Sequence, residues 1–178
     1  MPELLPVLSQ EAIEKLVDDM ARRISADYAG RNLVLIGVLK GAFVFLADLV
    51  RRLKIPVVVD FVGASSYGAQ CVSSGRITLT RPVTVDVQDR DVLLVEDIVD
   101  TGLTLAHLVA HVESLGARSV KVCAMIDKHE RRQTQVPVTY ACFHAGEGFL
   151  VGYGLDHDER YRELPGIYRL KFNQEGVP

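Results

Sequence analysis

The chain has 178 residues, of which 48% are hydrophobic and 24% charged, and its net charge at pH 7 is −3. This length fits one domain with a sizeable buried core, and the composition is that of an ordinary globular protein. A mildly acidic chain is poorly suited to non-specific nucleic-acid binding, which depends on Lys and Arg neutralising phosphates. We therefore expect a single domain over residues 1–178 that binds no nucleic acid.

Cysteine usage and hydropathy indicate the setting in which the chain works. Cys71, Cys123 and Cys142 are widely spaced and odd in number, which favours reduced thiols over a disulfide framework or a zinc site. The first ten residues lack the basic start and apolar core of a signal peptide. No run of apolar residues approaches the length of a membrane span. These features predict a cytoplasmic protein without a membrane segment.

Helices and strands are predicted to alternate in the first third of the chain. Ser9 is a suitable N-cap for a helix whose apolar residues recur at helical spacing. Lys40 lies in a tight turn between a strand and a helix, where a lysine is usually a solvated turn residue. The predicted helices cover residues 9–28 and 42–53, and the continuous apolar runs typical of buried strands cover residues 33–38 and 57–62.

A stretch of small and polar residues follows at positions 63–75 and contains three glycines. Such a stretch buries little surface, so it predicts a mobile loop, either a simple hairpin connection or a lid. Residues 76–81 alternate between polar and apolar side chains, which predicts a strand with one exposed face.

The most informative stretch begins at a buried strand predicted over residues 92–95. Glu96 and Asp97 follow where this strand should end, and Asp100 adds a third carboxylate before a helix predicted over residues 103–115. Ligands of parallel sheets bind beyond the carboxyl ends of the strands, and backbone N–H groups at a helix start attract anions. The pattern therefore points to a phosphorylated sugar whose hydroxyls meet the carboxylates. The alternative is that the acids only cap the helix and form a surface turn.

The second half of the chain repeats this arrangement of strands and polar strand ends. Lys128 follows one predicted strand, where it would be either a solvated residue or part of a site. The charge run over residues 156–163 would by itself be read as a solvated face. Strands are predicted over residues 119–126, 138–143 and 166–172.

Residues 96–104, EDIVDTGLT, resemble the phosphoribosyl-pyrophosphate (PRPP) motif of type I phosphoribosyltransferases, and the Glu-Asp opening with a third acid resembles the hypoxanthine-guanine phosphoribosyltransferases in particular. Further motifs extend the resemblance from about residue 33 to 170. It implies an α/β fold with a mainly parallel, twisted central sheet flanked by helices, a small hood subregion and a flexible loop. The core would cover residues 30–145, the hood the N-terminal segment and residues 146–178, and the loop residues 63–76.

The resemblance implies transfer of 5-phosphoribose from PRPP to hypoxanthine or guanine. The products would be IMP or GMP and pyrophosphate, in purine salvage, with Mg²⁺ as cofactor. Asp100 would act as general acid–base at N7 of the purine. The residues implied to hold the 5′-phosphate and ribose are Glu96, Asp97, Asp100, Thr101, Gly102, Leu103 and Thr104.

The remaining implied site residues come from other segments. Lys128 would donate to O6 of the purine, and because an ammonium only donates, it would reject the amino group of adenine. In the family, the pyrophosphate loop often contains a non-proline cis peptide. The resemblance implies Lys40, Gly41 and Arg162 for pyrophosphate, Ser66 and Tyr67 for the flexible loop, Lys128, Phe149, Leu150 and Asp156 for the purine, and Glu96, Asp97 and Asp156 for the metal.

Two positions depart from the family pattern, and several alternatives stay open. Leu103 stands where some relatives have a basic residue, and His129 where bacterial relatives are expected to have proline. The alternatives are a xanthine phosphoribosyltransferase, an RNA-binding pyrimidine-operon regulator with uracil phosphoribosyltransferase activity, and a catalytically silent nucleotide sensor. A Rossmann dehydrogenase is disfavoured because no GxGxxG follows a strand. By analogy we expect a homodimer or homotetramer.

Overall fold

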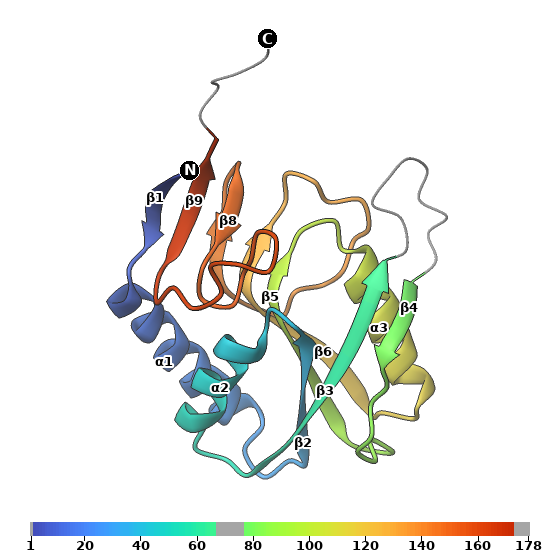
Figure 1. Ribbon diagram of the computed structural model, residues 1–178. Helices are drawn as coiled ribbons and strands as arrows, with labels where there is room; N and C mark the ends of the chain where they lie inside the picture. Colours follow the sequence, from blue (N-terminus) through green and yellow to red (C-terminus); the bar gives the residue numbers. More distant parts are fainter. Residues whose placement is uncertain (1, 67–76, 173–178) are drawn as a thin grey trace.

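The structure is a computed structural model that describes residues 2–66 and 77–172 (Figure 1). Two sheets and three helices make up these residues. The larger sheet has the strand order β4-β3-β2-β5-β6-β7, and the smaller one the order β1-β9-β8. In the described part of the chain, no helix is both long enough and apolar enough to cross a membrane.

The larger sheet is mainly parallel, as predicted. β2 pairs with β3 on one side and β5 on the other, β6 and β7 continue the parallel array, and only β4 runs antiparallel to its neighbour. The continuous apolar runs of the central strands suit this position, because both faces of a parallel sheet are covered. The strands are β2 (Leu33–Leu39), β3 (Val57–Ser66), β4 (Ile77–Arg81), β5 (Asp91–Val99), β6 (Ser119–Lys128) and β7 (Tyr140–Ala145).

Helices on both faces of the large sheet create two hydrophobic cores (Figure 1). In β2, Leu33 and Leu35 belong to the core beneath α1 and α2, and Val34 and Ile36 to the core beneath α3. Fully burying a leucine or isoleucine side chain stabilises a fold by about 1.5–3 kcal/mol, so these alternating side chains hold the three layers together. The helices are α1 (Gln10–Asp27), α2 (Phe43–Arg52) and α3 (Leu103–Ser114).

The smaller sheet lies on the side of the molecule where the parallel strands end (Figure 1). It contains β8 (Phe149–Val151) and β9 (Ile167–Lys171), together with β1 (Glu3–Leu8), which pairs with β9. β1 was not among the predicted strands. Proline is confined to edge strands and irregular positions, and the register indeed shifts beside Pro6.

Three predicted strand ends were wrong because polar residues do not end these strands. β5 runs on to Val99, so Glu96 and Asp97 lie within it. β3 extends to Ser66 and takes the first four residues of the expected loop, whereas Tyr67 lies outside the described residues. β6 continues through Lys128. In each case a neighbouring strand continues the ladder, and the sequence of one segment does not contain that information.

Candidate active site

The candidate site lies where the order of the central strands reverses. The chain passes from β2 to β3 on one side and then returns to β5 on the other side of β2. β2 leads into α2 and β5 into α3, on opposite faces of the sheet, so a crevice opens between their carboxyl ends. A cavity of about 300 Å³ occupies this position. The predicted site residues that line it are Lys40, Gly41, Glu96, Asp97, Asp100, Thr101, Gly102, Thr104, Asp156 and Arg162.

Two adjacent acids line this cavity, the buried Glu96 and the half-buried Asp97. The backbone N–H of Asp97 donates to Glu96 Oε1 at 3.2 Å, and the N–H of Ile98 donates to Asp97 Oδ1 at 2.8 Å. Burial, and then the neighbouring carboxylate, raise the pKa of Glu96 well above its usual range, and burial also raises the pKa of Asp97. The charge of Arg162 partly offsets the effect of burial on the pKa of Asp97, and hydroxyl donors or a bound cation would offset it further.

The turn after β2 packs directly against these acids. The peptide bond between Leu39 and Lys40 is cis. A Cβ atom added to Gly41 would overlap the Asp97 carboxylate, and one added to Gly154 would overlap the carbonyl oxygen of Gly41. Glycine is therefore required at both positions for the three segments to meet.

The loop between β5 and α3 lines the cavity at the start of α3. Gly102 has φ +81°, and a Cβ atom there would overlap the carbonyl oxygen of Thr134. The Thr101 carbonyl accepts hydrogen bonds from the N–H groups of Gln133, at 2.9 Å, and Thr134, at 3.1 Å. These bonds hold the loop that leads into α3, where the Leu103 N–H donates to Thr101 Oγ1 at 3.4 Å. The N–H groups at the start of a helix favour an anion, and Thr101, Gly102 and Thr104 line the cavity there.

Asp100 has one carboxylate oxygen available for chemistry. Its Oδ1 atom is buried and has no hydrogen-bond partner among the described residues. Its Oδ2 atom lies 3.4 Å from Nη1 of Arg131. A buried oxygen without a partner at the edge of a cavity is placed to accept a proton from a bound molecule.

Arg132 holds this loop, although it was not among the predicted site residues. Its side chain is only 6% exposed. It donates from Nε to the Asp100 carbonyl at 3.0 Å, and from Nη2 to the Val99 carbonyl at 3.1 Å and to Asp127 Oδ1 at 2.5 Å. In the sequence, Arg132 lies within the polar run that follows Lys128, and nothing in that run distinguishes it from a solvated arginine.

Cations and acids alternate along the opposite wall of the cavity. Arg162 donates from Nη1 to the Gly154 carbonyl at 2.7 Å, and its Nη2 lies 3.0 Å from Asp156 Oδ1. Its Nε is buried without a partner in the part of the chain that the structure describes. Lys40 Nζ lies 3.1 Å from Glu159 Oε2, and both side chains are largely exposed. These pairs can exchange one partner for an entering phosphate.

The predicted purine-binding residues other than Asp156 do not line this cavity. Lys128 is buried and donates to the Gly148 carbonyl at 2.9 Å. Phe149 is 46% exposed, whereas Leu150 is buried in β8. Leu103, predicted for the PRPP motif, is 41% exposed and also lies outside the cavity lining.

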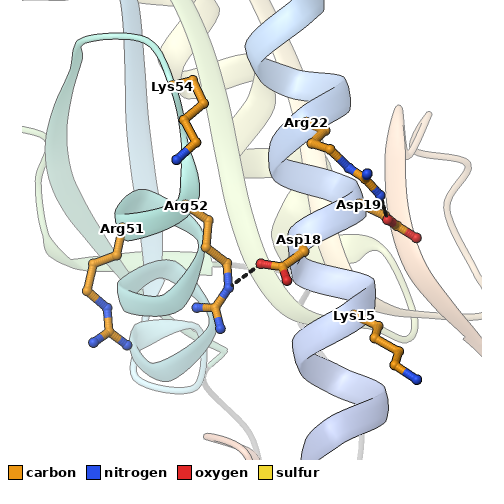
Figure 2. A pocket seen from close by; sticks show the side chains of 7 residues that line it. All are labelled: Lys15, Asp18, Asp19, Arg22, Arg51, Arg52 and Lys54. Atoms are coloured by element: carbon orange, nitrogen blue, oxygen red, sulfur yellow. Dashed lines mark hydrogen bonds and ion pairs between the residues drawn. The ribbon is translucent and has the colours of Figure 1, made fainter.

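A larger hollow of about 560 Å³ lies between α1 and α2 (Figure 2). It is rich in cationic side chains, and its three arginines have acidic partners: Arg52 Nε donates to Asp18 Oδ1 at 2.7 Å, Arg22 pairs with Asp19, and Arg51 pairs with Asp48. None of its lining residues comes from a strand end. It therefore does not compete with the crevice as the substrate site.

Comparison with known proteins agrees with this geometry. The family model for the phosphoribosyl transferase domain matches residues 6–158. A hypoxanthine-guanine phosphoribosyltransferase from Dictyostelium discoideum is 41% identical over 169 residues, covering 93% of this chain and 94% of that protein. The bifunctional protein TilS/HprT of Listeria innocua is 40% identical, but the chain spans only 26% of its length.

Solved structures give the same result. The crystal structure of a hypoxanthine-guanine phosphoribosyltransferase from Bacillus anthracis superposes with a TM-score of 0.90 at 37% identity, covering 97% of this chain and 100% of that one. The fold, the motif loop and these relatives place the chain in the phosphoribosyltransferase family, to whose hypoxanthine-guanine members it is similar over nearly its whole length.

Proposed function

We propose that the chain transfers 5-phosphoribose from PRPP to hypoxanthine or guanine, with IMP or GMP and pyrophosphate as products, in purine salvage. One observation carries the proposal. Residues from three distant segments, predicted to contact the 5′-phosphate and ribose or the diphosphate of PRPP, line a single cavity at the edge of the sheet. The names of the relatives support the choice of base.

PRPP binding follows from the charges of the cavity. The amides at the start of α3, with the side chains of Thr101 and Thr104, would hold the 5′-phosphate. Glu96 and Asp97 would accept hydrogen bonds from the ribose hydroxyls, in addition to the backbone N–H group that already donates to each carboxylate. Lys40, the Gly41 backbone and Arg162 would hold the diphosphate.

The chemical step breaks the bond between C1′ of the ribose and the diphosphate oxygen and forms a bond from C1′ to a purine nitrogen. Positive charge develops on the ribose as the diphosphate leaves, and the acids beneath the sugar stabilise it. Asp100 would exchange the proton at N7 of the purine through its free Oδ1 atom. We infer that positioning and electrostatics provide most of the acceleration.

Mg²⁺ is the cofactor that the acidic residues fit. Glu96, Asp97 and Asp156 offer carboxylate oxygens around one cavity, and Mg²⁺ prefers oxygen ligands. Burial and the charge of Asp97 raise the pKa of Glu96, and a bound cation would favour its ionised form. When bound, the ion would neutralise charge on the diphosphate.

The purine would bind beside the sugar, against Lys128, Phe149 and the Leu150 backbone, with Asp156 nearby. Lys128 Nζ lies 3.1 Å from Glu130 Oε2 and would exchange this contact for O6 of the base. Its burial makes an unpaired ammonium costly, so a base without an acceptor at this position would be rejected.

We further propose a flexible loop, a domain organisation and an oligomeric state for the chain. Ser66 and Tyr67 would belong to a loop that closes over the reacting centre and excludes water. The chain would act as one domain, with a core over residues 30–145 and a hood from the N-terminal segment and residues 146–178. We propose a cytoplasmic homodimer or homotetramer that acts on small molecules and binds neither nucleic acid nor membrane.

Incubation with PRPP, Mg²⁺ and either hypoxanthine or guanine tests the proposal. We expect nucleotide and pyrophosphate to form in equal amounts, and no pyrophosphate without the base. Product from xanthine or uracil, with none from hypoxanthine or guanine, would contradict the choice of base. Absence of any product in a protein that binds PRPP would indicate a nucleotide sensor.

A further inference from the structure

A group of metal-ligating side chains lies outside the PRPP cavity, at the ends of β6 and β7. Asp127 in β6 is paired with His144 in β7, and His129 follows the end of β6. Each residue offers one ligand atom, and these atoms all lie within 4.8 Å of one another. The carboxylate is buried, whereas the two imidazoles are 66% and 68% exposed. A buried anion is therefore covered by two side chains that solvent can reach.

The distances fit a small cation. His129 Nε2 lies 3.2 Å and His144 Nδ1 3.8 Å from the same oxygen, Asp127 Oδ2. Ligands about 2.0 Å from a tetrahedral Zn²⁺ lie about 3.3 Å apart, so the first distance already matches and the second needs a shift of roughly half an ångström. The two imidazole nitrogens lie within 4.8 Å of each other and reach the same separation when the rings turn toward one ion. Exposed imidazoles have the rotamer freedom for such a shift.

Simple ion pairs between the carboxylate and two protonated histidines explain the arrangement less well. The two imidazole rings are stacked, with centroids 6.0 Å apart and planes 18° from parallel. Two imidazolium charges at this separation repel each other. A divalent cation bound by one nitrogen of each imidazole and by the Asp127 carboxylate oxygen between them satisfies all three groups.

We propose that Asp127, His129 and His144 form a binding site for a transition-metal ion of the Zn²⁺ class. Two imidazoles and one carboxylate are the ligand types of such ions, whereas Mg²⁺ prefers an all-oxygen site. Three protein ligands leave a position open for water or another ligand. The site is separate from the Mg²⁺ site proposed in the PRPP cavity, and it does not depend on the proposed reaction.

The site is linked to the catalytic loop through one carboxylate. Asp127 Oδ1 accepts a hydrogen bond from Arg132, the side chain that also donates to the Val99 and Asp100 carbonyls. A cation on Oδ2 would therefore have Arg132 as an outer-shell neighbour. Outer-shell hydrogen bonds orient metal ligands, so Arg132 serves both the loop and the proposed site.

Calorimetric titration of the full chain with Zn²⁺ tests the proposal. Millimolar Mg²⁺ is kept in the buffer to occupy the carboxylates of the PRPP cavity. We expect one Zn²⁺ per chain, and we expect the double variant His129→Asn, His144→Asn to bind at least about tenfold more weakly. Both imidazoles are exposed, so the variant should fold normally, and its circular dichroism spectrum checks this.

The matched control removes the other pair of histidines that could bind zinc. His107 and His111 lie four residues apart on α3, a spacing that places them on one face of the helix. The variant His107→Asn, His111→Asn should keep the wild-type affinity. Equal affinities in wild type and the His129, His144 variant would overturn the proposal, as would loss of binding in the α3 variant alone.

Discussion

At the residue scale, the cavity depends on three carboxylates that are shielded from solvent to different degrees. Glu96 is buried, Asp97 is half-buried, and Asp100 keeps one buried oxygen without a partner in the described part of the chain. These three acids were recognisable in the sequence because paired acids after a buried strand are unusual. Arg132 was not recognisable, because the carbonyl groups it binds lie about 30 residues earlier in the chain.

Replacing Asp100 tests whether this residue acts in proton transfer or in PRPP binding. Asp100→Asn keeps the size of the side chain but removes its basic oxygen, so we expect kcat to fall by about 10²- to 10⁴-fold. The KM for PRPP should change little. Steady-state kinetics with hypoxanthine measures both values, with the exposed Leu103→Ala as control. Equal losses in kcat and PRPP affinity would assign Asp100 to binding instead.

Replacing Lys128 tests how the base is chosen. Lys128→Ala removes a buried ammonium that can only donate, so we expect discrimination between hypoxanthine and adenine to fall by about tenfold or more. The ratio of kcat/KM for the two bases is the measurement. Lys121→Ala, an exposed position on the same strand, should leave that ratio unchanged. An unchanged ratio in Lys128→Ala would mean that O6 is recognised elsewhere.

At the scale of elements, contacts between neighbouring segments shape the site. Gly41 admits the Asp97 carboxylate, and Gly102 allows the turn into α3 beside Thr134. Most helices and central strands followed from periodicity, including α1 with its N-cap Ser9, whose Oγ accepts from the Ala12 N–H at 3.2 Å. The carboxyl ends of β3, β5 and β6 did not, because they depend on the ladder that an adjacent strand supplies.

Arg132 should stabilise both the loop and the fold. Arg132→Met leaves the Asp127 carboxylate and two loop carbonyls without this donor, so we expect a loss of about 3–5 kcal/mol in the free energy of unfolding. Urea denaturation measures the loss. Arg131→Met removes a side chain that is 63% exposed and should cost less than about 1 kcal/mol. Similar losses in the two variants would show that the buried contacts of Arg132 do not hold the loop.

At the scale of the whole molecule, the carboxyl ends of the parallel strands form the substrate cavity, and the amino ends contribute to stability. The amino ends of β5 and β6 are joined by Asp91, which accepts from Arg118 Nη2 at 2.5 Å and from Ser119 Oγ at 2.6 Å. The α/β class and the mainly parallel sheet were implied by the resemblance of residues 96–104 and the other motifs to type I phosphoribosyltransferases, and the continuous apolar runs of the central strands are typical of such a sheet. β1 was not predicted, because its pairing with β9 joins segments at opposite ends of the chain.

Asp91 should give the fold an acid-sensitive contribution. Hydrogen bonds from Arg118 hold the pKa of Asp91 below its usual value, so the folded state favours the ionised form. The stabilisation is fully present above the unfolded-state pKa of about 3.9 and is lost as the pH falls through the lower folded-state pKa. We therefore expect the free energy of unfolding to fall less between neutral and acidic pH in Asp91→Asn than in the wild type. Asp19→Asn, at an exposed position, is the control, and identical slopes in the two variants would contradict this role.

We propose that the protein transfers phosphoribose from PRPP to a 6-oxopurine in this cavity. The most direct test is kcat/KM for hypoxanthine, guanine, xanthine, adenine and uracil, measured with PRPP and Mg²⁺ under one set of conditions. We predict rapid use of hypoxanthine or guanine, with adenine and uracil refused. Comparable rates with adenine, or activity with uracil alone, would contradict the assignment of Lys128 and the base pocket even if the PRPP cavity is correct.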